Sequence, residues 1–181
     1  MRILGIPGSL RRLSYNRGML LAARELAPDG IEIEITDLSP IPLYNGDAEA
    51  EGIPAPVQAL KTRIEGADAL LFATPEYNHL VPGVLKNAID WASRPPNAFR
   101  RKPAAIMGAS AGATGTARAQ LALRQVLTAV ECYVLPAPQV LVAGARDRFD
   151  SNGRLTDEKA RENIRSLLEA LPAWIDRLRP R

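Results

Sequence analysis

Short apolar segments alternate along this chain with longer segments of helical pattern, and this alternation restricts the possible folds more than any other feature. The apolar segments are residues 3–6, 31–35, 69–73, 104–108 and 140–142, and the helical ones are residues 17–27, 57–65, 83–92, 116–130 and 158–178. In the last helical segment, apolar residues recur every three or four positions from Ile164 to Leu178, which places them on one face. Strand and helix in this order predict a parallel sheet with helices on both faces. The length of 181 residues fits a single domain over residues 1–181.

The residues from Gly8 to Asn16 lie between the first predicted strand and the first predicted helix. They include the hydroxyls of Ser9 and Ser14 and the guanidinium of Arg11. A helix N-terminus presents free N–H groups and a partial positive charge, so further donors beside it favour a phosphate monoester. The alternative is that Ser14 or Asn16 only caps the helix and that the arginines are solvated.

The two common nucleotide-binding loops do not fit this segment. A P-loop needs a lysine after its glycines, and none follows Gly8 here. A dinucleotide fingerprint needs three glycines, and only Gly5 and Gly8 precede the helix. Asp37 is therefore interpreted as a polar residue at a strand end rather than as a ribose ligand.

Parallel sheets of this class bind ligands beyond the carboxyl ends of their strands. The loops after the third and fourth predicted strands, residues 74–83 and 109–115, are rich in polar, proline and glycine residues. We therefore expect them to converge with residues 8–16 on one ligand site. The long segment 39–56, with prolines at 40, 42, 54 and 56, is predicted to serve either that site or a subunit contact.

Composition disfavours several other classes of protein. The net charge of +3 comes from arginines spread along the chain without interleaved aromatic residues, which disfavours nucleic acid as a partner. No segment approaches the ~20 apolar residues of a membrane span, and the N-terminal apolar stretch is too short for a signal peptide, so we expect a cytoplasmic protein with no membrane partner. The single cysteine, Cys132, lies among apolar residues and is predicted to be a buried structural thiol. No cluster of histidine, cysteine and carboxylate has the spacing of metal ligands, so no metal is expected.

Three motifs occur together in this chain. They are Gly8-Ser9-Leu10-Arg11 followed by Ser14 and Asn16, then Thr74-Pro75-Glu76-Tyr77-Asn78, then Leu85-Lys86-Asn87-Ala88-Ile89-Asp90-Trp91. Together they resemble the NADPH-dependent FMN reductase family, to which residues 41–45 and 153–157 are also similar. The resemblance implies a flavodoxin-like fold with a five-stranded parallel sheet in the order 2-1-3-4-5. It also implies bound FMN, NADPH or NADH as electron donor, and a small-molecule acceptor such as a quinone, an azo compound, chromate or a flavin.

The same resemblance assigns roles to particular residues. The FMN phosphate would be held by Ser9, Arg11, Ser14 and Asn16, the isoalloxazine ring would be lined by Pro75, Glu76, Tyr77 and Asn78, and the other side would be closed by Ser110 and Gly112. Because proline has no N–H, the free main-chain donors of Tyr77 and Asn78 are the candidates for the pyrimidine edge of the ring. The flavin carries the redox chemistry, so no catalytic side chain is expected.

Several residues near these motifs are given structural interpretations. His79 is expected to be solvated or structural, since hydride transfer to a flavin needs no histidine base. Lys86 and Asp90, four residues apart on a helix, are predicted to form a surface or interface ion pair. Trp91 is expected to pack its helix, and the direction of Glu76 is left open.

The sequence also leads to predictions about the oligomeric state and to two alternative functions. The resemblance implies a homodimer or homotetramer with helices 83–92 and 116–130 at the interface, and Gln139, where an acidic partner is expected in related proteins, leaves the tetramer in doubt. The rivals are a non-enzymatic electron carrier of the flavodoxin type and a flavin-binding regulatory module. Arg11 and Arg12 make the expected rim basic, which disfavours the carrier, since such carriers are acidic there.

Overall fold

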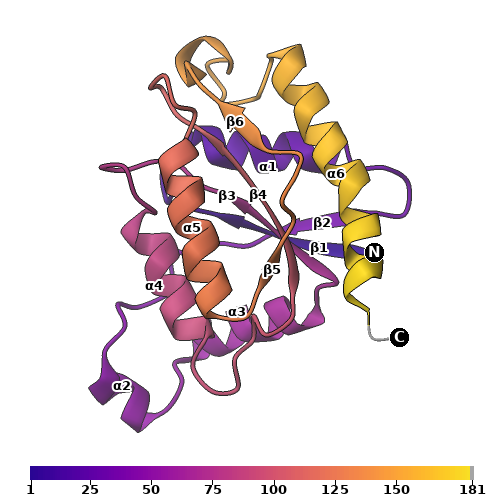
Figure 1. Cartoon of the computed structure of the whole chain (residues 1–181). Coiled ribbons are helices and arrows are strands. Elements are labelled where there is room, and N and C mark those ends of the chain that lie inside the picture. Colours follow the sequence, from indigo (N-terminus) through magenta and orange to yellow (C-terminus); the bar gives the residue numbers. More distant parts are fainter. Residues whose placement is uncertain (180–181) are drawn as a thin grey trace.

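A parallel sheet forms the central layer of the computed structural model, which describes residues 1–179 (Figure 1). Its strands are β1 (Arg2–Pro7), β2 (Glu32–Ile35), β3 (Ala69–Ala73), β4 (Pro103–Ala109), β5 (Tyr133–Val134) and β6 (Val140–Val142). They lie in the predicted order β2-β1-β3-β4-β5, and every pair is parallel. β3 and β4 are buried along their whole length, as expected for strands covered on both faces.

Two short strands share the position of the fifth strand. The strand predicted at residues 140–142 is present as β6, but β5 was not predicted, so the sheet has six strands rather than five. β5 pairs with the first residues of β4, and β6 pairs with the last three, Met107 to Ala109. Pro136 and Pro138 lie between β5 and β6. A proline offers no N–H to the ladder, so the pairing stops there and resumes at Val140.

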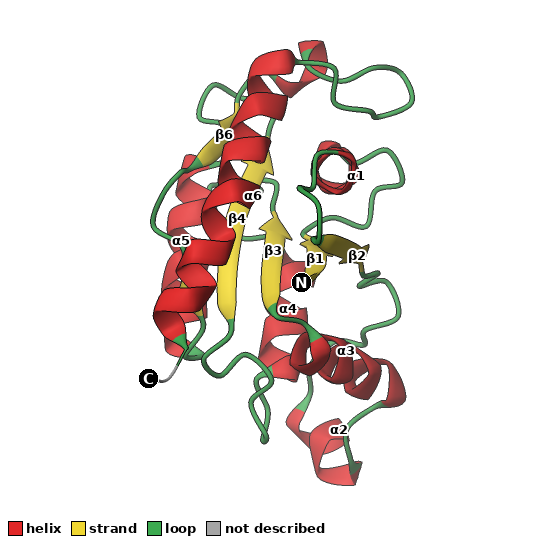
Figure 2. Ribbon diagram, turned by 90° about the vertical axis from the view of Figure 1, so that its right-hand side faces the viewer, coloured by secondary structure: helices red, strands yellow, loops and turns green. Residues whose placement is uncertain are grey.

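Helices cover both faces of the sheet, as predicted (Figures 1 and 2). They are α1 (Tyr15–Glu25), α2 (Gly46–Glu51), α3 (Ala55–Gly66), α4 (Gly83–Ala92), α5 (Ala117–Ala129) and α6 (Glu158–Leu178), with a 3-10 turn at Ala145–Asp147. Buried residues of α1 and α6 form one apolar cluster with the sheet, and those of α3, α4 and α5 form a second. α2 was not predicted; it has no buried residue and lies apart from the layers in both views.

The carboxyl ends of β1, β3 and β4 are held together by close main-chain contacts. The Gly8 N–H donates to the Ala73 carbonyl at 2.8 Å, and the Thr74 N–H donates to the Met107 carbonyl at 3.0 Å. A Cβ on Gly108 would overlap the Thr116 hydroxyl and lie 2.5 Å from the Thr74 carbonyl oxygen. The three loops that leave this edge are therefore fixed against one another.

Candidate functional site

A pocket of about 170 Å³ opens at this edge of the sheet. It is lined by Ser9, Arg11, Ser14, Tyr15, Asn16, Pro75, Glu76, Tyr77, Ala109, Ser110 and Ala111. The expected convergence of the loops after β1, β3 and β4 is thereby confirmed. Of the residues predicted for the site, only Asn78 and Gly112 are outside this lining, and each lies next to a residue within it.

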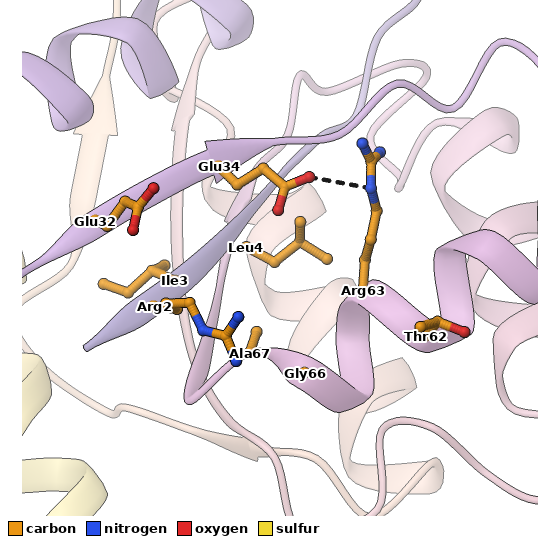
Figure 3. Close-up of a pocket in the computed structure, with 9 residues that line it drawn as sticks. All are labelled: Arg2, Ile3, Leu4, Glu32, Glu34, Thr62, Arg63, Gly66 and Ala67. Atoms are coloured by element: carbon orange, nitrogen blue, oxygen red, sulfur yellow. Dashed lines mark ion pairs between the residues drawn. The ribbon is translucent and has the colours of Figure 1, made fainter.

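A larger pocket of about 300 Å³ lies elsewhere, between β1, β2 and α3 (Figure 3). It contains none of the predicted site residues. One acidic and one basic group in it pair with each other, since the Arg63 Nε lies 3.0 Å from a carboxylate oxygen of Glu34. It also lies away from the carboxyl edge where this class of sheet binds ligands, so we assign the site to the smaller pocket.

The N-terminus of α1 supplies the anion-binding half of the pocket. Ser14 is the N-cap, and its buried hydroxyl accepts the Arg17 N–H at 3.4 Å. The N–H groups of Tyr15 and Asn16, in the first turn, have no carbonyl acceptor within the helix and carry its partial positive charge. The exposed Arg11 guanidinium lies over the Tyr15 ring, 5.7 Å from its centroid. This set of donors fits a phosphate monoester.

The Asn16 side chain bonds to the main chain of β4 rather than facing a phosphate site. Its Nδ2 donates to the Ala109 carbonyl and its Oδ1 accepts the Ala109 N–H, both at 2.9 Å. The side chain is 2% exposed, so both ends of the amide are engaged with the end of β4. Any contact of Asn16 with a phosphate would use its main-chain N–H. The amide instead ties the start of α1 to the neighbouring loop.

Residues 77–80 form a tight turn at the other half of the pocket. The Tyr77 N–H donates to the Leu80 carbonyl at 3.2 Å, and the Leu80 N–H donates to the Tyr77 carbonyl at 3.0 Å. Asn78 and His79 both have left-handed backbone, with φ of 49° and 68°, as the central residues of a type I′ turn do. The Tyr77 N–H is therefore not free, which corrects one of the two predicted ring donors. His79 is exposed at the tip of the turn.

The Glu76 carboxylate binds to the start of α5. One carboxylate oxygen accepts the N–H groups of Arg118 and Ala119, and the other lies 3.1 Å from the Arg118 Nη1. The sequence left the direction of the Glu76 side chain open, and in the structure this side chain binds to α5. The Ser9 hydroxyl, 3.4 Å from the Tyr77 hydroxyl, links the two halves of the pocket.

Ser110 and Gly112 are positioned by the end of β6 and by the residues that follow it. The Ser110 N–H donates to the Val142 carbonyl at 3.0 Å, and the Gly112 carbonyl accepts the Gly144 N–H at 3.2 Å. These bonds place Ser110 in the pocket wall and Gly112 just outside it. Contact of either residue with a flavin stays a prediction.

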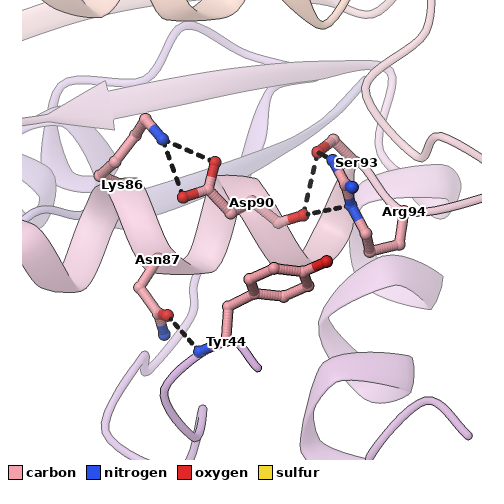
Figure 4. A network of polar contacts seen from close by, with 6 residues as sticks. All are labelled: Tyr44, Lys86, Asn87, Asp90, Ser93 and Arg94. Carbon is pink, nitrogen blue, oxygen red and sulfur yellow. Dashed lines mark hydrogen bonds and ion pairs between the residues drawn. The ribbon is translucent and has the colours of Figure 1, made fainter. Parts of the chain in front are cut away.

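The structural interpretations of Lys86, Asp90, Trp91 and Cys132 are confirmed. Lys86 and Asp90 form an exposed ion pair on α4 at 2.7 Å (Figure 4). Trp91 is fully buried, and its Nε1 donates to the Pro42 carbonyl. Cys132 is 3% exposed, and burial raises the pKa of its thiol to about 12. Among residues 1–179, no three histidine, cysteine, aspartate or glutamate side chains gather as they would around a metal ion.

The segment 39–56 packs against α4 rather than the pocket. Its Tyr44 N–H donates to the Asn87 Oδ1 at 2.8 Å, as Figure 4 shows, and the Tyr44 ring lies 5.4 Å from the Arg94 guanidinium. None of its residues lines the site. The segment therefore lies beside α4, and its role in a subunit contact stays a prediction. No helix within residues 1–179 has the length and apolar character needed to span a membrane.

Comparisons with known proteins agree with this geometry. The profile of a family described as NADPH-dependent FMN reductase matches residues 1–147. An NAD(P)H-dependent FMN reductase of Pseudomonas aeruginosa is 55% identical over 180 residues, covering 99% of this chain and 97% of that protein. An NAD(P)H:quinone oxidoreductase of Solanum tuberosum is 45% identical, with 96% and 92% covered. The solved structure of FerB, a flavoenzyme NAD(P)H:(acceptor) oxidoreductase from Paracoccus denitrificans, superposes with a TM-score of 0.87 at 36% identity over 97% of both chains. The chain belongs to the NADPH-dependent FMN reductase family.

Proposed function

We propose that this chain is an FMN-dependent NAD(P)H oxidoreductase whose electron acceptor is a small quinone. The observation that carries the proposal is the pocket in which the N-terminus of α1 and Arg11 face a second loop of proline and tyrosine. One half suits a phosphate and the other suits a flat ring, which are the two parts of FMN. Bound FMN would supply the hydride and electron-transfer chemistry between NADPH or NADH and the acceptor.

The protein's own residues bind and orient. The first turn of α1, together with Ser9 and Arg11, holds the phosphate through N–H, hydroxyl and guanidinium donors. Pro75 and the exposed Tyr77 offer apolar surface to the ring. The main-chain N–H of Asn78 remains a candidate donor to the pyrimidine edge. No acid or base side chain is needed, because the flavin carries the redox chemistry.

A quinone is favoured as acceptor by the shape of the rim and by the relatives. Tyr77 is 52% exposed and Leu80 is 60% exposed beside the pocket, so a flat aromatic molecule can stack there without displacing a side chain. The Solanum tuberosum relative is itself named a quinone oxidoreductase. Azo compounds, chromate and free flavin are the other acceptors to be compared.

The test begins with the purified protein loaded with FMN and mixed with NADPH or NADH without oxygen. Rapid loss of the oxidised flavin absorbance, followed by its return when benzoquinone is added, is the expected result. Accumulation of one-electron-reduced flavin would favour the electron carrier, and binding of FMN without reduction would favour the regulatory module. Faster reoxidation by an azo dye, chromate or free FMN than by benzoquinone would overturn the choice of acceptor.

We further propose a homodimer that uses the face of α4 and α5. Leu121 on α5 is 71% exposed, and Leu43, in the segment that packs against α4, is 84% exposed. Contact with a second copy would remove this apolar surface from water. Light scattering coupled to size-exclusion chromatography tests the mass, and Leu121→Glu should yield a monomer; a wild-type monomer would refute the proposal.

We also propose a cytoplasmic location, since the lone cysteine suits a reducing compartment.

A further inference from the structure

The helix α5 starts without a cap of its own. The preceding residue, Thr116, has left-handed backbone with φ of 75°, and its side chain makes no capping bond. Its buried hydroxyl instead accepts a bond from the Gln120 Nε2 at 3.1 Å. The first turn also contains no acidic residue to offset the partial positive charge of the helix. The free main-chain N–H groups in the first turn of α5 therefore need hydrogen-bond acceptors from outside the helix.

Glu76 satisfies them from a loop on another strand. Its Oε2 accepts the N–H groups of Arg118 and Ala119 at 3.1 and 3.2 Å. Its Oε1 accepts from the Arg118 Nη1 at 3.1 Å and from the Thr114 hydroxyl at 3.4 Å. The side chain is only 8% exposed, so this carboxylate is fixed among four donors. Such charge-assisted bonds are stronger than those between neutral groups.

This contact joins two loops that both border the pocket. Glu76 lies between Pro75 and Tyr77, which line the half assigned to the ring. The second loop is the one after β4. Its residues 111–113 are exposed, and Thr114 is the first of its residues that Glu76 contacts. A change at Glu76 therefore removes the side-chain bonds that tie Thr114 and the first turn of α5 to the loop 74–80.

The carboxylate also distinguishes two helix N-termini near the pocket. Those of α1 and α5 would each attract an anion if left open. Glu76 already occupies the start of α5, whereas the first turn of α1 holds no acidic residue. A phosphate is therefore directed to α1.

We infer that Glu76 is a positioning residue that caps α5 from a different loop and so holds the end of the loop 110–116, at Thr114, beside the flavin ring. The flavin part of this inference rests on the proposed function. The carboxylate acts through α5, and Glu76 is also one of the residues that line the pocket.

The test compares Glu76→Gln and Glu76→Ala with the wild-type protein, free of FMN, by hydrogen exchange. Peptides covering residues 114–120 should exchange ~10-fold faster in both variants, because a lost cap loosens the first turn, while peptides of α1 should not change. Glu34→Gln is the matched control, since it breaks the exposed Glu34–Arg63 pair at the other pocket (Figure 3). Acetate should restore protection in Glu76→Ala by refilling the space, and chloride at equal ionic strength should not.

The affinity for FMN is then measured for the same proteins. Both Glu76 variants should bind FMN ~10-fold more weakly, with partial recovery in acetate for Glu76→Ala alone. Unchanged exchange at residues 114–120, no effect of acetate, or faster exchange with unchanged FMN affinity would each overturn the inference. Glu76→Gln keeps the test valid where Glu76→Ala does not fold. Failure of the proposed function looks different, because wild-type protein would then bind no FMN while exchange still responds to Glu76.

Discussion

Replacement of Asn16 by alanine is predicted to lower both the stability and the FMN affinity of the protein. The asparagine amide makes two bonds of 2.9 Å to the main chain of Ala109, which is 1% exposed. An unsatisfied buried N–H or carbonyl costs about 1 to 3 kcal/mol. Losing both partners should therefore lower the free energy of unfolding by about 3 kcal/mol. A domain with about 5 to 15 kcal/mol of stability remains folded after such a loss.

The assay is urea unfolding followed by circular dichroism, combined with titration of the variant with FMN. The midpoint should fall at an unchanged slope, since the fold and its buried surface are kept. The affinity for FMN should also fall by about tenfold, or about 1.4 kcal/mol, because the start of α1 is no longer tied to the end of β4.

Asn97→Ala is the matched control for this prediction. Asn97 makes the same kind of paired bonds, from its Nδ2 to the Val130 carbonyl at 2.9 Å and from the Phe99 N–H to its Oδ1 at 3.0 Å. It lies before β4 rather than after it, away from the pocket. It should lose stability while keeping its FMN affinity. Equal loss of affinity in both variants, or a change below about 0.5 kcal/mol for Asn16→Ala, would refute the reasoning.

Three further predictions concern the phosphate, the thiol and the sheet edge. Arg11→Ala should weaken FMN binding about 30-fold, or about 2 kcal/mol, by removing a charge-assisted contact; unchanged affinity in a titration would place Arg11 outside the site. The pKa of Cys132 is raised in the folded protein from 9.0 to about 12, so the unfolded chain releases the proton first. Stability should therefore fall as the pH rises from 9.0 toward about 12, and urea midpoints of Cys132→Ala should lack that slope. Gly108→Ala should destabilise the protein by more than about 2 kcal/mol, because its Cβ overlaps the Thr116 hydroxyl; a thermal midpoint equal to that of wild type would contradict the contact.

The strand order and the pocket position could be predicted because they depend on local patterns. Apolar runs and helical periodicity mark the layers, and parallel strands bring their following loops to one edge. The split of the last strand was missed, although Pro136 and Pro138 signal an interrupted ladder. The start of α1 was placed two residues late, since Tyr15 and Asn16 carry no apolar helical pattern.

The partners of single side chains could not be predicted in the same way. Asn16 and Ala109 are 93 residues apart, and Glu76 and Arg118 are 42 apart. Each pair meets only because the sheet brings their loops together. A serine or asparagine before a helix reads equally well as a cap or as a ligand, so the motif located the site without separating the two roles. The hydrogen bond of the Tyr77 N–H could not be predicted either, because it depends on left-handed backbone at Asn78 and His79.

The distribution of buried polar side chains explains why this edge can hold a ligand site. Most of them belong to the loops at the carboxyl ends of the strands or to the helix starts that follow, namely Ser9, Ser14, Asn16, Thr36, Thr74, Thr116 and Gln120. Apolar packing fixes the layers but tolerates sliding, whereas a buried hydrogen bond has one geometry and is costly to break. Within residues 1–179, no buried side-chain nitrogen or oxygen lacks a partner. These bonds therefore fix the loops before any ligand arrives. A polar residue directly after an apolar strand marks two of them in the sequence, Thr36 and Thr74.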